Sequence, residues 1–298
     1  MSDLFTRHYD FTYGVVETMT PMIRRIVARN PSPFTFHGTG TYIVGQDSVA
    51  IIDPGPALPA HIDAMLAAVR AETVTHLLIT HTHRDHSPAC HAVKAATGAL
   101  CYGFGPHGVG RVLRGETVEE GADVEFTPDV EIRNGDIIEG CGWSIACLHT
   151  PGHTSNHMCY HLREENVLFT GDHVMGWSTT IISPPDGDMA AYLESLRYLL
   201  RREDACYWPT HGPAIEHPKR LVSGLLDHRQ QRQQQILEAL NCGVRRIDKL
   251  VPRIYAELPK SMYPAAARSV LATMILLTER GSVMVDGDLS INAEFYLP

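Results

Sequence analysis

Long apolar runs are missing from this 298-residue sequence, and their absence excludes two classes of protein. A membrane-spanning helix needs about 20 consecutive apolar residues, and no stretch of this chain is that long. Between Met1 and Asn30, charged residues interrupt the apolar ones, so this segment lacks the continuous apolar core of a secretory signal. The sequence therefore predicts a cytoplasmic protein with no membrane partner.

Cysteine pairs and positive charge are also sparse. The seven cysteines are scattered singly, without the paired spacing typical of metal-binding cysteines. They predict reduced thiols without disulfides, as is usual in the cytoplasm. The formal net charge of −9 argues against broad electrostatic attraction to nucleic acid, although a local basic patch stays open.

Histidine, in contrast, is abundant, with 17 residues. Three histidines and a carboxylate, His81, His83, Asp85 and His86, directly follow the apolar segment 76–79. In an extended segment His81 and His83 face the same way, and the next turn can bring Asp85 and His86 to the other side of one cavity. A solvated loop rich in histidine is the alternative. Four ligand-type side chains after a buried strand favour a metal site.

The chain is long enough for one large domain and a smaller one. Apolar spacing up to residue 217 predicts strands alternating with helices, followed by a β-rich middle region. The predicted helices of this part span 58–72, 88–97 and 188–202. After residue 217 the pattern predicts three helices, over 218–240, 247–255 and 265–280, and a β-hairpin over 282–296, which together resemble a winged helix. We therefore predict a catalytic domain over 1–217 and a C-terminal module over 218–298.

Three more candidate ligands, His153, Asp172 and His211, each follow an apolar strand and lie beside a glycine. Taken singly, each fits an ordinary turn or core residue. Together with the histidine cluster they give enough ligand-type residues for two metal ions. The predicted division is His81, His83 and His153 for one ion, Asp85, His86 and His211 for the other, and Asp172 as the bridge between them.

The histidine cluster, with the segments 151–154, 171–172 and 210–212, resembles the metal-binding motifs of the metallo-β-lactamase-fold hydrolase superfamily, in the family order. The resemblance covers most of residues 30 to 217. It implies an α+β fold, the four-layer αββα sandwich, with the metals in a cleft at one edge of two sheets. Asp53 matches the family's first-strand aspartate, which supports the histidine loop as an outer contact.

Two divalent ions about 3.5 to 4 Å apart can share a water, lower its pKa and present hydroxide to a carbonyl or phosphoryl group. We expect Asp85 to be catalytic as well as a ligand, by orienting the hydroxide or moving its proton. His157 and His173 are candidates for the leaving-group acid or for outer support of the ligands, and we favour support. Nitrogen and oxygen ligands without cysteine favour zinc, and manganese or iron also fit.

The presence of Asp172 narrows the class of substrate that we expect. True metallo-β-lactamases generally lack a bridging aspartate and are exported, so β-lactam hydrolysis is not expected. The bridge is similar to that of thioester-cleaving glyoxalase II and of the phosphodiester-cleaving nucleases of the superfamily. We therefore expect hydrolysis of an ester, thioester or related carbonyl bond in a small molecule.

Two alternatives stay open. The tail resembles a β-lactamase-like group that includes a single-strand endoribonuclease, and an RNA substrate would require a basic surface beside the cleft. Interspersed acidic residues favour a solvated helix face for the basic residues instead. A non-hydrolytic di-iron protein is the second alternative, but the sequence after 217 lacks the pattern of a flavin or rubredoxin partner domain. The candidate basic residues are Arg201, Arg202, Lys219, Arg220, Arg229 and Arg232.

Overall fold

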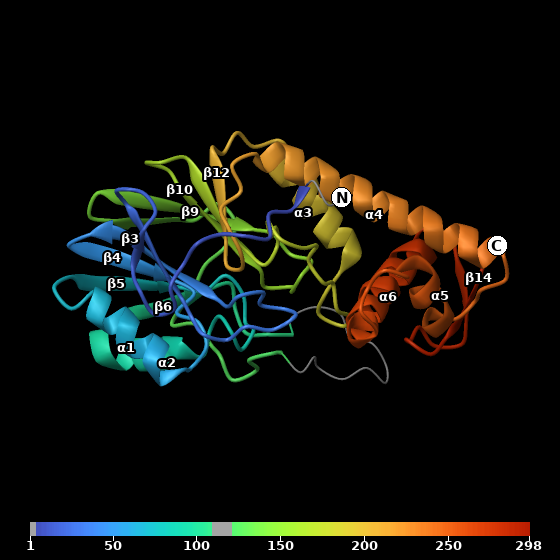
Figure 1. Ribbon diagram of the computed structural model, residues 1–298, viewed down its shortest axis with the longest axis horizontal. Coiled ribbons are helices and arrows are strands. Elements are labelled where there is room, and N and C mark those ends of the chain that lie inside the picture. The colour runs from blue at the N-terminus through green and yellow to red at the C-terminus, as the bar shows by residue number, and fades with distance from the viewer. Residues whose placement is uncertain (1–3, 109–120) are drawn as a thin grey trace.

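Two β-sheets form the main body of the computed structural model, which describes residues 4–108 and 121–298 (Figure 1). The first sheet has seven strands in sequence order. It is antiparallel up to β4 and parallel from β4 to β7. Its strands are β1 (Glu17–Thr18), β2 (Ile23–Val27), β3 (Gly40–Gln46), β4 (Ser48–Ile52), β5 (Thr73–Leu78), β6 (Leu100–Gly103) and β7 (Val130–Glu131).

The second sheet has five strands in the order β12-β11-β10-β9-β8. Its strands pair antiparallel except for β11 and β12, which are parallel and are connected through a helix, as parallel neighbours require. The strands are β8 (Ile137–Gly140), β9 (Trp143–His149), β10 (Met158–Leu162), β11 (Val167–Gly171) and β12 (Cys206–Pro209).

Apolar side chains fill the space between the sheets, with Tyr42 and Trp143 among the largest that are fully buried. Helices α1 (Pro59–Ala68) and α2 (Ala89–Thr97) cover the outer face of the first sheet. Helix α3 (Met189–Leu200) packs on the second. The four layers confirm the predicted αββα sandwich. Asp188 caps the N-terminus of α3, because its carboxylate accepts the Ala191 N–H at 2.9 Å.

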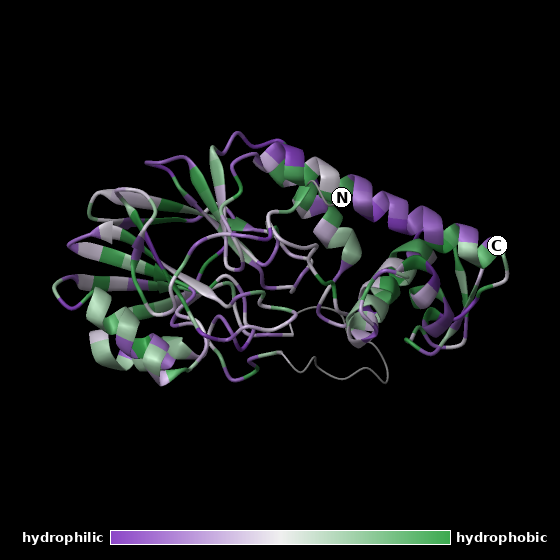
Figure 2. Ribbon diagram, viewed as in Figure 1, coloured by the Kyte–Doolittle hydropathy of each residue, from purple (hydrophilic) through white to green (hydrophobic). Residues whose placement is uncertain are grey.

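The C-terminal part contains the predicted helices and hairpin. Its elements are α4 (Pro218–Asn241), α5 (Ile247–Ile254), a 3₁₀ turn (Lys260–Met262), α6 (Tyr263–Glu279), β13 (Met284–Asp286) and β14 (Glu294–Tyr296). Figure 2 shows hydrophilic residues along much of α4 and hydrophobic residues along α6, which is buried in the middle. Leu221 and Leu225 of α4 and Leu276 of α6 belong to the same buried cluster as α3, so the module packs tightly on the sandwich. The boundary near 217 stays a prediction.

One prediction about the cysteines is wrong. Cys90 in α2 and Cys101 in β6 form a disulfide, with their Cα atoms 6.8 Å apart. The chain reverses at Gly98, whose φ of 77° ends α2 and sends β6 back beside it. Sequence spacing does not show this reversal as a cysteine pair. The expected reduced thiols were one argument for a cytoplasmic location, since disulfides are unusual in a reducing compartment. This argument no longer holds for Cys90 and Cys101, and the location stays a prediction.

Candidate metal centre

The seven predicted ligands meet at one edge of the two sheets. The histidine cluster follows β5 of the first sheet, and the other three ligands follow β9, β11 and β12 of the second. His81, His86 and His211 are fully buried, whereas Asp85 and His153 are partly exposed. The partly exposed pair marks the side from which a substrate could enter.

His81, His83 and His153 form what we call the first group. Nε2 of His81 lies 2.9 Å from Nδ1 of His83, and Nε2 of His153 lies 3.2 Å from the same Nδ1. Three ring nitrogens therefore converge on one point, as the sequence predicts for the first ion.

Asp85, His86 and His211 form the second group. Oδ2 of Asp85 lies 3.1 Å from Nε2 of His211 and 3.3 Å from Nε2 of His86. Oδ1 of Asp172 lies 3.4 Å from Nε2 of His211, and its Oδ2 lies 3.7 Å from Nε2 of His153 in the first group. The two oxygens of Asp172 thus face one group each, which is the geometry of a bridge.

A second observation, separate from the distances between the ligand atoms, also indicates that these atoms can bind metal ions. Nε2 of His86 and Oδ1 of Asp172 are buried, and within the described parts of the chain neither has a hydrogen-bond partner. Buried polar atoms without partners are costly and are rare unless an ion or water satisfies them. Nitrogen and carboxylate oxygen suit zinc, manganese or iron, so the geometry leaves the identity of the metal open.

Electrostatics differ between the groups. Burial opposes protonation of His211, but the carboxylates of Asp172 and Asp85 outweigh it and raise the pKa of His211 to about 10. Burial and the neighbouring histidines hold the pKa of His81 well below its usual value. The surroundings of His211 in the second group therefore stabilise positive charge, whereas in the first group His81 is held as the neutral imidazole, the form that binds metal.

Asp53 lies behind the second group. Its Oδ2 accepts a hydrogen bond from Nδ1 of His86 at 2.8 Å and another from the Thr210 hydroxyl at 3.0 Å. Its two oxygens also accept the backbone N–H and the hydroxyl of Thr80. Asp53 has a φ of 48°, which non-glycine residues seldom adopt, and this turn aims its carboxylate inwards. Its contacts are those of an outer support that fixes the ring of His86.

Backbone carbonyls support two other histidines. Nδ1 of His153 donates to the Ile181 carbonyl at 2.8 Å, and Nδ1 of His211 donates to the Gly38 carbonyl at 3.0 Å. Each bond fixes the tautomer that leaves Nε2 for a metal. Sequence reasoning missed both, because a carbonyl carries no residue signature. The threonines at 80 and 210 did offer a signal, since each directly precedes a candidate ligand.

His157 and His173 are both fully buried. Nε2 of His157 accepts the backbone N–H of Asp172 at 3.2 Å, and its Nδ1 lies 2.9 Å from the Thr150 hydroxyl. Burial, with His153 and Arg229, lowers the pKa of His173 to about 3, and burial holds the pKa of His157 well below its usual value. Both rings are therefore neutral near pH 7 and lack the proton that a leaving-group acid would give.

The six candidate basic residues differ in exposure: Arg201, Lys219 and Arg220 are exposed, whereas Arg202 and Arg232 are partly buried. Arg229 is buried, which contradicts the expected solvated helix face at that position. Arg202 pairs with Asp204 at 2.6 Å, and Lys219 pairs with Glu203. In the parts of the chain that the structure covers, no helix is both long and apolar enough to cross a membrane.

Two family descriptions match this chain. "Metallo-beta-lactamase superfamily" matches residues 35–211, more than half of the chain, and "Beta-lactamase associated winged helix domain" matches residues 247–291. The first range contains all seven predicted ligands, and the second lies within the C-terminal module.

Curated relatives cover most of the chain. An atrochrysone carboxyl ACP thioesterase of Aspergillus chevalieri is 29% identical over 272 residues, 88% of this chain and 82% of that protein. The beta-lactamase-like protein 2 homolog of Drosophila melanogaster is 31% identical over 300 residues, 95% of this chain and 96% of that protein.

A solved structure extends the likeness to both parts of the molecule. The crystal structure of a beta-lactamase domain protein from Burkholderia ambifaria superposes with a TM-score of 0.78. It covers 97% of this chain and 96% of that chain at 18% identity, which shows a shared fold.

Proposed function

The chain belongs to the metallo-beta-lactamase superfamily and is a hydrolase of that fold, and we propose that it cleaves a thioester of a small-molecule acid. The observation that carries the two-metal hydrolytic part of this proposal is the bridge geometry of Asp172, whose two oxygens face one ligand group each. When bound there, two divalent ions would lower the pKa of a shared water and polarise the carbonyl oxygen of the substrate. Zinc is the metal we propose, because all ligand atoms are nitrogen or carboxylate oxygen.

The thioester class rests on the relatives. Several curated proteins that match most of the chain are named as atrochrysone carboxyl ACP thioesterases, one of them 30% identical over 228 residues. A thioester carbonyl is a strong electrophile with a good leaving group. Protonation of the leaving thiolate is therefore not essential, and this fits a centre whose His157 and His173 are neutral.

Asp85 is the proposed catalytic side chain. It is the more exposed of the two carboxylates in the centre, with a side-chain exposure of 25% against 11% for Asp172. The Thr39 hydroxyl donates to its Oδ2 at 3.2 Å and helps to hold the carboxylate in place. From this position Asp85 accepts a proton from the attacking water and keeps the water oriented towards the substrate.

An aromatic pair beside the second group suits the acyl part of the substrate. The rings of Phe36 and Trp177 stack with their centroids 4.6 Å apart. Gly212, next to His211, has a φ of 95°, and a Cβ there would lie 3.0 Å from the Trp177 ring. Glycine therefore allows Trp177 to lie against the metal loop. Phe36 and Trp177 keep exposed surface on which an apolar or aromatic acyl group can pack.

The test is a substrate panel on the zinc-loaded full-length protein. The panel contains N-acetylcysteamine thioesters with aliphatic and aromatic acyl groups, a lactone, a chromogenic phosphodiester and single-stranded RNA. We expect the highest kcat/KM for a thioester, and loss of every activity in His83→Ala. Turnover of RNA or the phosphodiester without thioester cleavage would contradict the proposal, as would activity that survives His83→Ala. A coloured iron form in metal analysis would favour the di-iron alternative.

A further inference from the structure

The segment 180–182 lies directly against the metal centre. The Ile181 carbonyl accepts the hydrogen bond from Nδ1 of His153, at 2.8 Å. The Thr180 hydroxyl contacts the backbone carbonyls of Asp172 and His173, at 2.7 and 3.0 Å. This short segment therefore orients one proposed ligand and borders the backbone of the bridging residue.

The same segment is fastened to two helices of the C-terminal module. Arg229 of α4 donates from Nη2 to the Thr180 carbonyl. The hydroxyl of Ser269 in α6 accepts the Ile182 N–H at 3.2 Å. The residues on either side of Ile181 are thus each held by a different C-terminal helix, and all these side chains are buried. Displacing α4 or α6 would displace the carbonyl that orients His153.

Burial of Arg229 indicates a structural role for its charge. Its residue exposure is 4%, and its Nε is buried without a hydrogen-bond partner among the described residues. Its guanidinium lies over the ring of Tyr192, 5.1 Å from the centroid, and bonds the Thr180 carbonyl. A buried guanidinium costs free energy unless such contacts satisfy it. The guanidinium of Arg229 is buried, so it is not available to bind RNA, and its hydrogen bond to the Thr180 carbonyl connects α4 to segment 180–182.

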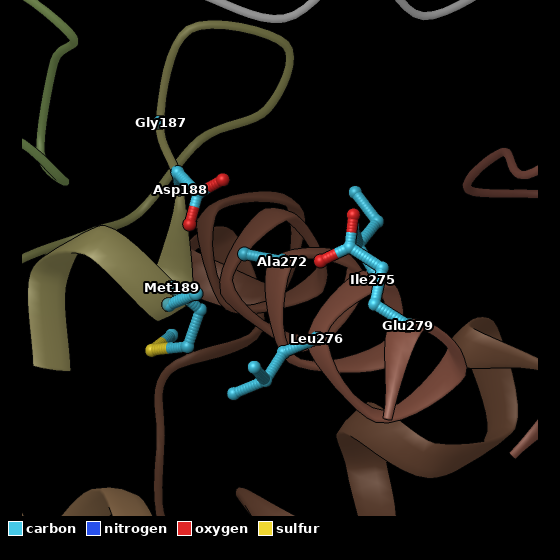
Figure 3. Close-up of a pocket in the computed structure, with 8 residues that line it drawn as sticks. Gly187, Asp188, Met189, Ala272, Ile275, Leu276 and Glu279 are labelled. Atoms are coloured by element: carbon cyan, nitrogen blue, oxygen red, sulfur yellow. The ribbon is translucent and has the colours of Figure 1, made fainter. Parts of the chain in front are cut away.

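Helices α3 and α6 also pack on each other beside the contacts that join segment 180–182 to the C-terminal module. Figure 3 shows Asp188 and Met189, at the start of α3, lining a small pocket together with Ala272 and Leu276 of α6. Met189, Ala272 and Leu276 belong to one buried apolar cluster. Interiors packed in this way transmit small displacements and do not absorb them. The module is therefore placed to hold segment 180–182 in a single position.

We propose that Arg229 and Ser269 are positioning residues through which the C-terminal module sets the metal affinity of the first group. They act on the Ile181 carbonyl, and that carbonyl fixes the ring of His153. The second group is supported by Asp53 and the Gly38 carbonyl, which belong to the sandwich itself, and it is linked to segment 180–182 only through the backbone of Asp172. The proposal rests on the metal centre of the proposed function and is independent of the substrate.

The test is a zinc titration of the full-length protein against a chromophoric chelator, with Arg229→Met and Ser269→Ala. Outer partners of metal ligands typically contribute about 10- to 100-fold in metal affinity. We expect one of the two binding steps to weaken by roughly tenfold, at the lower end of that range, since both residues act through Ile181. The other step should weaken clearly less, because segment 180–182 reaches it only through the backbone of Asp172.

Matched controls exist on the same two helices. Arg232 of α4 donates to the Ile254 carbonyl at 2.8 Å and lies over the Tyr255 ring, both within the module. The hydroxyl of Thr273, one turn after Ser269 in α6, bonds only within its helix. Arg232→Met and Thr273→Val therefore remove comparable groups without touching segment 180–182, and both binding steps should stay as in the parent protein.

A cobalt-substituted protein gives a second readout. The visible absorption of bound cobalt reports the geometry of its ligands, and Ser269→Ala should alter the band of one site clearly more than that of the other. Equal weakening of both steps, or no weakening in either variant, would overturn the proposal. Thermal unfolding without metal checks that the variants fold, and if Arg229→Met does not fold, Ser269→Ala carries the test alone. Absence of thioesterase activity would refute the proposed function and leave this titration interpretable.

Discussion

The two ligand groups differ in what holds them. In the second group, the ring of His86 is fixed by the carboxylate of Asp53 inside the sandwich. In the first group, His153 is fixed by the Ile181 carbonyl, in a segment fastened to C-terminal helices. On the account proposed above, the sandwich alone supports the second group, whereas one ligand of the first group, His153, also depends on the C-terminal module. The module is then part of the site without supplying a ligand.

The largest effect is expected where the groups meet. Asp172→Ala removes the carboxylate that faces both groups, so both metal-binding steps should weaken and kcat/KM should fall by more than about 100-fold, beyond the range typical of outer contacts. Steady-state kinetics and the chelator titration measure the two effects. An Asp172→Ala protein that keeps two tight steps would remove the bridge from this account.

Single ligands should separate the groups. His153→Ala and His211→Ala each remove one ring nitrogen, one from the first group and one from the second. Each variant should retain about one of the two ions expected at such a centre. Metal analysis after gel filtration measures the retained metal, and the cobalt spectrum identifies which site is lost. The same spectrum from both variants would mean that the two groups form a single site.

Weakening an outer support of a ligand should reduce metal affinity less than removing a ligand does, and the reduction should again differ between the two groups. Asp53→Asn keeps the shape of the side chain but weakens its bonds to His86, Thr80 and Thr210. We expect about 10- to 100-fold weaker binding at the second group, whose His86 bonds Asp53 directly, and a smaller effect at the first group, where Asp53 reaches His81 only through the Thr80 hydroxyl. In a chelator titration this is the counterpart of Arg229→Met, because the opposite step should shift more. A larger shift of the same step in both variants would contradict the separate support of the two groups.

The sequence predicted the helices and the seven candidate ligands because these features have local signatures, whereas the αββα sandwich followed from the resemblance to the family. The ligands are polar residues directly after apolar strands, and four of them lie within the short segment 81–86. What it missed depends on contacts between distant segments. Arg229 lies in the polar run of α4, and no spacing shows that Thr180 will lie beneath it. The Ile181 carbonyl and the pairing of Cys90 with Cys101 are hidden for the same reason.

The smallest expected effect is on the stability of the protein at acidic pH, and it involves His61, which is linked to Asp53 through Thr41. The Thr41 hydroxyl donates to the Asp53 carbonyl and lies 2.9 Å from Nε2 of His61. Burial lowers the pKa of His61 from 6.5 to about 4. Because the folded pKa is depressed, only the unfolded chain takes up this proton between those values, so His61 makes stability fall as the pH falls through that window.

His61→Gln should therefore reduce the slope of unfolding free energy against pH in that window, by up to about 1.4 kcal/mol per pH unit. Urea unfolding of the metal-free protein at several pH values measures the slope. His76→Gln is a comparison variant, since burial lowers the pKa of the less buried His76 as well, and it should reduce the slope less. An unchanged slope in His61→Gln would show that His61 is protonated in the folded chain.

The two-group centre itself is tested most directly by anomalous diffraction at the zinc edge from crystals of the zinc-loaded protein. The account predicts two peaks about 3.5 to 4 Å apart. One should lie among His81, His83 and His153, and the other among Asp85, His86 and His211, with Asp172 between them. A single peak, or zinc bound away from these side chains, would contradict it.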